Sequence, residues 1–215
     1  MADFGQLLEG YSRFRENGWS AQRTRWGQLA AGQSPKVMVI ACSDSRVDPA
    51  QIFDANPGEM FVVRNVANLV PPFEQDGGYH GVSAALEFAV TQLQVSDILV
   101  MGHGFCGGCA AALTGQFDNA GHGEGHFIGH WIHMLDEARR RVRERHRDGL
   151  DRAAFADMET EGVRTSLGNL RTFPWVRERE AAGTLTLRGA VFAISDGVLH
   201  LLDEESGRFS PCAVG

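Results

Sequence analysis

The sequence lacks the features that mark membrane, nucleic-acid-binding and disulfide-stabilised proteins. It has no run of about 18 consecutive apolar residues, so it predicts no membrane-spanning helix. Its 27 acidic residues outnumber its 20 basic ones, and the net charge of −7 argues against a nucleic-acid partner, which needs a basic face. Four cysteines are too few for a disulfide scaffold and suit a reducing compartment. We therefore expect a cytoplasmic protein with no membrane or nucleic-acid partner.

Signals of targeting and of repetition are also missing. The N-terminal residues, MADFGQ, lack the basic and apolar regions of a secretory signal. The chain contains no internal repeat and no low-complexity segment. With 215 residues and 43% apolar content, it can bury one substantial core, but a second full domain is not expected.

The N-terminal segment has a helical pattern of its own. Apolar residues recur near helical spacing over residues 4–14, and Gln33-Ser34-Pro35 then breaks the chain. We expect residues 1–34 to form a helical arm that packs on the body or on a partner subunit, and residues 35–215 to form a single α/β domain.

Apolar runs rich in β-branched residues predict strands that are buried on both faces of a sheet. These runs cover residues 36–41, 60–66 and 97–101. Helical patterns cover residues 81–95, 109–113, 127–147 and 151–179, the last with a kink at Phe173-Pro174. Two more apolar runs, 184–194 and 198–202, flank the hairpin signal Asp196-Gly197. The order predicts an α/β fold, with a mostly parallel central sheet, an antiparallel edge strand and flanking helices.

Side chains able to bind metal follow two of these strands directly. Cys42 and Asp44 come after the run 36–41, and His103-x-x-Cys106 comes after the run 97–101. Because ligand sites gather outside the carboxyl ends of parallel strands, a separation of about 60 residues does not keep the two motifs apart. Two thiols, an imidazole and a carboxylate are good zinc ligands. The sequence therefore predicts one zinc site built from both motifs.

Arg46 indicates chemistry at this site, because a purely structural zinc site has no use for a cation. Paired with Asp44 through two hydrogen bonds, Arg46 would hold the carboxylate away from the metal. Asp44 could then accept a hydrogen bond from a metal-bound hydroxide and orient it for attack. Otherwise Asp44 is a fourth ligand in a closed state, and its pairing with Arg46 is a structural salt bridge beside a closed site.

Three further motifs have competing interpretations. Residues 102–107 match the nucleotide-binding pattern G-x-G-x-x-G, but residues 118–124 do not form the second strand that this pattern needs. Cys106-x-x-Cys109 is similar to a redox motif, although a metal-bound Cys106 would leave Cys109 as a small core residue. A histidine cluster can be a solvated face, an adventitious metal site or a second metal site; it comprises His122, His126, His130 and His133.

The two motifs together resemble those of the β-class carbonic anhydrases. CSDSR at 42–46 and HGFCGG at 103–108 carry the resemblance, which covers about residues 30–202. It extends through Gly58-Glu59, FVVRNVANLV at 61–70, Glu87 and SLGNL at 166–170. It implies an enzyme that reversibly hydrates CO2 to bicarbonate and a proton, through attack of zinc-bound hydroxide, with one zinc ion per chain. It also implies a homodimer or a larger homo-oligomer such as a tetramer, with N-terminal helices that clasp the partner.

The resemblance assigns roles to individual residues. Cys42, His103 and Cys106 would be the permanent zinc ligands, and Asp44 and Arg46 the catalytic dyad beside the open position. The substrate-pocket positions would be Gln33, Phe61, Val66, Phe88 and Gly107. Gln33 would hydrogen-bond bicarbonate, and since it can come from a different chain than the zinc ligands, the pocket would lie at the dimer interface.

The chain is closer to plant-type members of this family than to the bicarbonate-regulated bacterial ones, and it departs from both. Val39 stands where the regulated enzymes carry tryptophan, which argues against their non-catalytic bicarbonate site. Many plant members have tyrosine at the position of Phe88 and histidine at that of Gln92, so a proton route through those groups is missing. His80, solvent and buffer are the relays left open.

Charge counting predicts an alkaline preference. Two thiolate ligands cancel the double charge of zinc, whereas three neutral histidines would leave it intact, so this site should acidify water less. Two alternative functions stay open at this point. One is hydrolysis of carbon disulfide or carbonyl sulfide on the same scaffold, and the other is a zinc-stabilised binding module without turnover.

Overall fold

The computed structural model describes residues 3–75, 78–119 and 123–213 of the chain. Its internal contacts divide the chain into two compact units, Met1–Ser34 and Pro35–Gly215. In the described residues, no helix is both long and apolar enough to cross a lipid bilayer.

The N-terminal unit is helical, and the helix expected at residues 4–14 is confirmed. Its elements are α1 (Phe4–Arg13), the π-helical η1 (Phe14–Trp19) and α2 (Arg23–Leu29). A capping box begins α1, since the Asp3 carboxylate accepts the Gln6 amide and the Gln6 side chain accepts the Asp3 amide. The large apolar side chains of this segment are exposed: Phe4, Leu7, Leu8, Tyr11 and Phe14.

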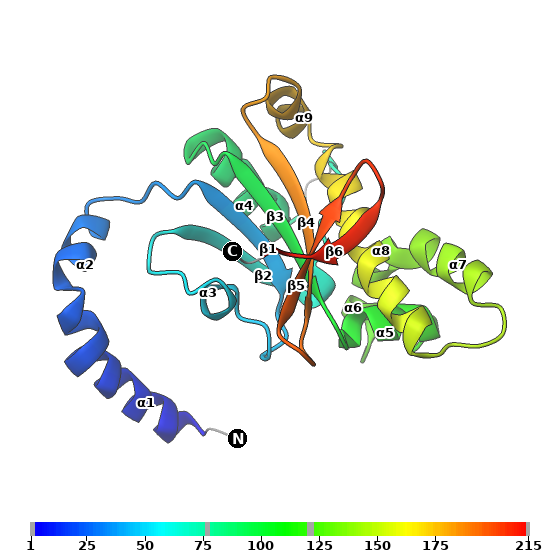
Figure 1. The fold of residues 1–215 in the computed structure, drawn as a ribbon, viewed down its shortest axis with the longest axis horizontal. Helices are drawn as coiled ribbons and strands as arrows, with labels where there is room; N and C mark the ends of the chain where they lie inside the picture. Colours follow the sequence, from blue (N-terminus) through cyan, green and yellow to red (C-terminus); the bar gives the residue numbers. More distant parts are fainter. Residues whose placement is uncertain (1–2, 76–77, 120–122, 214–215) are drawn as a thin grey trace. The chain divides into compact units, whose positions relative to one another are not determined.

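A six-stranded sheet in the order β2-β1-β3-β4-β5-β6 forms the centre of the second unit (Figure 1). The strands are β1 (Val37–Cys42), β2 (Met60–Asn65), β3 (Asp97–His103), β4 (Thr186–Ala193), β5 (Val198–Asp203) and β6 (Arg208–Pro211). The first four pair in parallel, β5 pairs antiparallel with β4, and β6 pairs antiparallel with β5. The predicted mostly parallel sheet and the hairpin around Asp196-Gly197 are confirmed.

The antiparallel edge differs from the expectation in one strand. The edge is β6, which no pattern in the sequence predicted, and β5 lies between β4 and β6. A tight turn joins β5 to β6, in which the Asp203 carboxylate accepts the amides of Glu205 and Ser206. The strand itself is only four residues long and ends at Pro211, so it carries neither a clear alternation nor a full set of amide donors.

Helices connect and flank the strands. They are α3 (Pro49–Ile52), η2 (Val66–Asn68), α4 (Gly81–Glu87), η3 (Phe88–Gln92), α5 (Gly107–Thr114), α6 (His126–Ile132), η4 (His133–Leu135), α7 (Asp136–Arg145), α8 (Arg152–Leu170) and α9 (Pro174–Ala181). The helical stretch expected at 127–147 is thus divided by a 3-10 turn. The kink expected at Phe173-Pro174 is a full break, because Pro174 begins a new helix at its first position.

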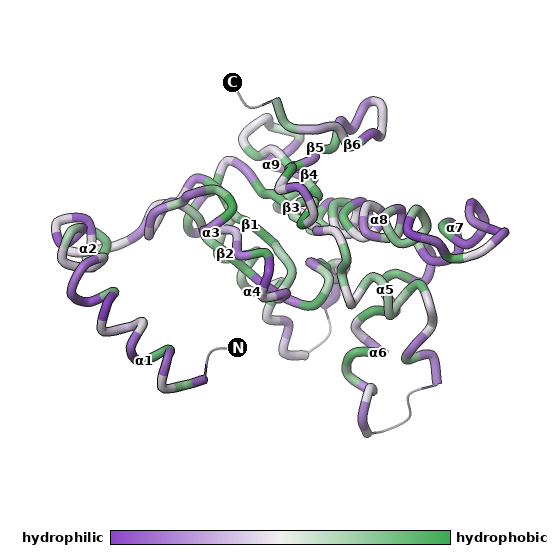
Figure 2. The backbone as a smooth tube through the Cα atoms, turned by 60° about the horizontal axis from the view of Figure 1, so that its bottom comes forward, coloured by the Kyte–Doolittle hydropathy of each residue, from purple (hydrophilic) through white to green (hydrophobic). Residues whose placement is uncertain are grey.

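β1 and β3 are buried on both faces of the sheet, as their apolar runs predicted, whereas β2 is only partly buried. Along β1, Met38 and Ile40 belong to a core cluster with Val163 and Leu167 of α8. Val39, between them, points to a second cluster on the opposite face. Figure 2 shows the hydropathy of the backbone along the chain, with hydrophobic β1 and β3 and a largely hydrophilic α7.

Candidate metal centre

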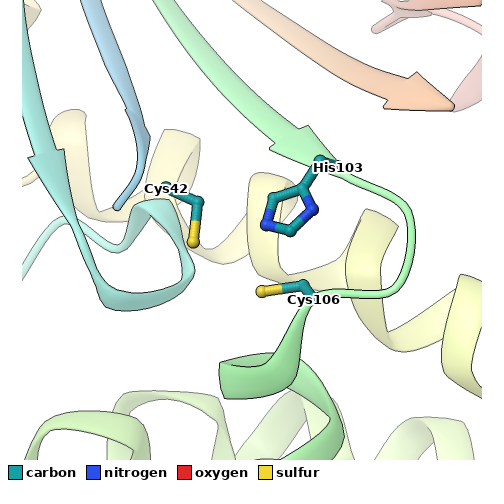
Figure 3. A group of neighbouring side chains, drawn as sticks. All are labelled: Cys42, His103 and Cys106. Carbon is teal, nitrogen blue, oxygen red and sulfur yellow. The ribbon is translucent and has the colours of Figure 1, made fainter. Parts of the chain in front are cut away.

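Two neighbouring parallel strands and one helix bring three metal-binding side chains together. Cys42 is the last residue of β1, His103 is the last residue of β3, and Cys106 directly precedes α5. One ligand atom from each of the three lies within 4.8 Å of the other two, and all three residues are buried. Figure 3 shows the two sulfur atoms and the imidazole ring facing a common point.

The imidazole of His103 is oriented for a cation. Its Nδ1 donates to the Gly104 carbonyl over 2.9 Å, because a carbonyl oxygen can only accept. The neutral ring therefore carries a lone pair on Nε2, which is buried and has no hydrogen-bond partner. An unpaired buried nitrogen is costly, and a metal ion bound there would remove that cost. Two sulfurs and one imidazole nitrogen form a donor set that fits zinc.

The two thiols would resist ionisation without a cation. The neighbouring Cys106 thiol and burial raise the pKa of Cys42 to about 12. The Cys109 thiol and burial raise the pKa of Cys106 to about 12 as well. The position of Cys106 at the start of α5 is therefore not enough by itself to hold a thiolate. A bound dication reverses this balance, because a coordinating thiol is deprotonated outright.

Asp44 and Arg46 lie beside the three ligands in a forked contact. Arg46 Nε donates to Asp44 Oδ1 over 2.9 Å, and Arg46 Nη2 donates to Asp44 Oδ2 over 2.7 Å. The Arg46 guanidinium holds the pKa of the Asp44 carboxyl well below its usual range. Asp44 Oδ2 lies 4.0 Å from His103 Nε2, so this carboxylate is next to the ligand cluster while arginine binds it.

Two supporting residues were not foreseen from the sequence. Arg46 Nη2 also donates to the carbonyl of Phe105 over 3.0 Å. The guanidinium of Arg64 donates to the carbonyls of Cys42 and Asp44 over 2.9 and 2.7 Å, and it pairs with Asp48. The sequence did hold a signal for this supporting role. Arg64 is a charged residue within the apolar strand β2, and it directly precedes Asn65, which pairs with Cys42.

The expected pocket residues occupy different places. The rings of Phe61 and Phe88 contact each other with centroids 5.9 Å apart. Val66 instead lines an open cleft of about 540 Å³, whose wall includes Phe127, His130 and Trp131 but neither phenylalanine of that pair. Gly107 is the first residue of α5, and Gln33 belongs to the N-terminal unit. Val66 also lies beside the start of α5, since a Cβ on Gly108 would be 2.8 Å from Val66 Cγ1.

The histidine cluster does not form a metal site where the structure describes it. His133 Nδ1 lies 2.9 Å from an Asp136 carboxylate oxygen, and His126 packs edge-on against Phe127. Among the described residues, Cys42, His103 and Cys106 are the one group of potential ligands close enough to hold a metal ion. His122 lies outside the described residues.

Cys109 occupies the position expected of a core residue. It is buried in a cluster with Leu113 and Met158, and its thiol neighbours Cys106.

Comparison with known proteins finds carbonic anhydrases at the level of family, sequence and structure. The family model described as carbonic anhydrase matches residues 37–199. "Beta carbonic anhydrase 3" of Arabidopsis thaliana is 37% identical over 196 residues, which cover 91% of this chain and 75% of the relative. Among solved structures, the β-carbonic anhydrase CcaA is similar to this chain with a TM-score of 0.89 and 31% identity. The match covers 98% of this chain and 92% of the CcaA chain. One of two tetrameric β-carbonic anhydrases from Sordaria macrospora has a TM-score of 0.77 and 27% identity over 98% of both chains.

Proposed function

The chain belongs to the β-class carbonic anhydrases and catalyses zinc-dependent hydration of CO2, and we propose that Asp44 and Arg46 form its catalytic dyad. The observation that supports this role is the forked contact between them, directly beside the Cys42, His103 and Cys106 cluster. Asp44 Oδ2 lies 4.0 Å from the buried Nε2 of His103, a position that a salt bridge serving only surface stability would not require.

Each residue of the centre has a defined task. Cys42, His103 and Cys106 hold the metal, which when bound acts as a Lewis acid and makes water nucleophilic near neutral pH. Arg46 keeps Asp44 ionised and turned away from the metal. The Asp44 carboxylate would then accept a hydrogen bond from the attacking water and so orient it toward CO2. Lysine could not take the place of Arg46, since it cannot form the fork.

We propose that a second copy of the chain completes the substrate pocket. Gln33, Phe61, Val66, Phe88 and Gly107 would line it, with the aromatic pair as an apolar wall for CO2 and Gln33 as a hydrogen-bond donor to bicarbonate. The support is that large apolar side chains are exposed along α1 and that Val66 and Phe127 line an open, apolar cleft, both of which a second copy could cover. The Sordaria macrospora relatives are tetrameric. A homodimer or a tetramer would fit, with the helical arm of residues 1–34 clasping the catalytic unit of a partner.

We further propose a cytoplasmic location. All four cysteines are free thiols, and two of them belong to the metal centre. A reducing compartment would keep them so.

The purified protein is expected to contain one zinc ion per chain and to acidify CO2-saturated, weakly buffered solution at a rate proportional to its concentration. The measurement is stopped-flow indicator absorbance, together with zinc analysis. Chelator-treated protein is the control, and added zinc should restore its rate. Carbon disulfide is the second substrate to test, with sulfide release as the signal. Sulfide release without CO2 hydration, or zinc without any turnover, would contradict the function.

The rate is expected to increase from about pH 7 to about pH 9, because the thiolates of Cys42 and Cys106 cancel the charge of the metal and leave its water less acidic. The sign follows from which form reacts. Hydroxide rather than water would be the nucleophile toward CO2, so kcat/KM for hydration should grow as pH passes upward through the controlling pKa. Zinc content and circular dichroism at each pH serve as controls for metal loss and unfolding. A profile that is flat or falls over this range would count against the thiolate-based argument.

A further inference from the structure

We propose that Glu159 and Arg152 are positioning residues that clamp the loop Gly104–Cys106 to helix α8 and thereby hold Arg46 against Asp44. This inference rests on the proposed role of the dyad. It concerns a part of the protein outside the ligand motifs, since both residues belong to α8, more than 40 positions beyond Cys106.

The clamp begins with an ion pair between a buried carboxylate and a half-exposed arginine. Glu159 is only 4% exposed, and both of its carboxylate oxygens accept hydrogen bonds from Arg152 over 2.9 Å. A carboxylate so deeply buried needs a charged partner and further donors to be tolerated. One such donor comes from the metal centre, since the backbone amide of Cys106 donates to Glu159 Oε1 over 3.4 Å. Glu159 therefore connects α8 to the residue that carries one of the zinc ligands.

Arg152 contacts the same loop through the ring of Phe105. Its guanidinium carbon lies 4.2 Å from the centroid of the Phe105 ring, which is cation–π contact. Phe105 has a backbone φ of +59°, in the left-handed region that residues with a side chain rarely adopt. Surrounding contacts must maintain such a conformation. The stacked arginine supplies one of them, so the shape of the loop depends on Arg152.

That loop shape reaches the dyad through one carbonyl group. The carbonyl of Phe105 accepts a hydrogen bond from Arg46 Nη2 over 3.0 Å. Of the two dyad side chains, Arg46 is the more exposed, at 48% against 18% for Asp44. The Phe105 carbonyl thus anchors a side chain that is otherwise half in solvent. Contacts run without a gap from Glu159 through Arg152, Phe105 and Arg46 to Asp44.

The test compares two buried acids on one helix. Glu159→Gln removes the charge of the clamp, while Glu161→Gln removes that of a carboxylate which is 7% exposed and pairs with Arg141 and Arg145 instead. Both variants should lose some thermal stability. Glu159→Gln alone is expected to lower kcat/KM for CO2 by roughly tenfold and to release zinc faster to a chelator, while it is still purified with one zinc per chain. Equal effects of the two variants on kcat/KM would overturn the proposal.

A double-mutant cycle separates positioning from general damage. In an Arg46→Ala background, Glu159→Gln is expected to lower kcat/KM by less than about twofold, because the path through Arg46 is already broken. An undiminished tenfold loss in that background would show that Glu159 does not act through Arg46. Failure of the dyad itself has a different signature, since Arg46→Ala alone would then keep wild-type turnover.

Arg152→Lys provides a second route if Glu159→Gln does not fold. The side chain of Arg152 is half exposed, and lysine keeps its charge but can neither form the fork nor stack as a plane. The expected result is a severalfold loss of kcat/KM with zinc retained, and wild-type turnover in this variant would refute the clamp.

Discussion

Replacing Arg46 with alanine is expected to lower kcat/KM for CO2 by about a hundredfold to ten-thousandfold, while the protein keeps one zinc ion per chain. The carboxylate of Asp44 loses both bonds of the fork and lies close enough to the centre to turn onto the metal. A carboxylate bound there fills the position at which water must bind. Stopped-flow hydration assays and zinc analysis on the same sample measure both halves of this expectation.

A matched control exists for this substitution. Arg139 forms a similar fork with Asp118, with bonds of 2.7 and 2.8 Å, and neither residue belongs to the metal centre. Arg139→Ala should leave kcat/KM within about twofold of wild type, because the partly exposed pair that it removes lies outside the metal centre. Arg46→Lys should resemble Arg46→Ala, since lysine keeps the charge without the fork. Turnover near the wild-type rate in both Arg46 variants would remove the dyad from the mechanism.

Replacing Cys42 with serine is expected to abolish turnover and to reduce bound zinc to less than about a tenth of an ion per chain. A hydroxyl group does not ionise to replace a thiolate, and only His103 and Cys106 would be left as ligands. Because Cys42 lies at the buried end of β1 and serine is of similar size, the fold should persist. Zinc analysis, the hydration assay and circular dichroism together distinguish loss of the metal from loss of the structure.

Cys109→Ser is the matched control for the loss of a buried thiol. Cys109 lies beside Cys106 and is 2% exposed, yet it is not part of the ligand cluster. Zinc content should stay at one per chain and turnover within about twofold of wild type, with some loss of stability from a buried hydroxyl. The redox interpretation of the Cys106-x-x-Cys109 motif requires the opposite result, an inactive Cys109→Ser protein.

The sequence could predict the elements whose residues follow a hydrophobic pattern over several positions. The β-branched runs at β1 and β3 are buried and the one at β2 is partly buried, so hydrophobicity alone located them within one or two residues. The metal centre was predictable because its residue types are rare in such a pattern and follow two of those strands. Parallel strands ending at one edge then required Cys42 and His103 to approach each other.

Single long-range contacts could not be predicted in this way. The Phe105 carbonyl and Glu159 act through one or two hydrogen bonds each, and nothing in the local sequence states which distant group they meet. The short edge strand β6 was missed because four residues are too few to establish a period. The 3-10 turn at His133–Leu135 was missed because the helical pattern continues through it.

The two strand-borne ligands differ from the third in what sets their positions. Cys42 and His103 end adjacent strands, so the sheet's repeat of about 4.8 Å determines their spacing, and the packed interior on both faces resists any change in it. Cys106 instead follows two residues that belong to no strand or helix. When a ligand exchanges or a metal ion is released, the first side chain to move is therefore expected to be that of Cys106. Variants selected for tighter metal retention would be expected to carry their changes there and to leave β1 and β3 alone.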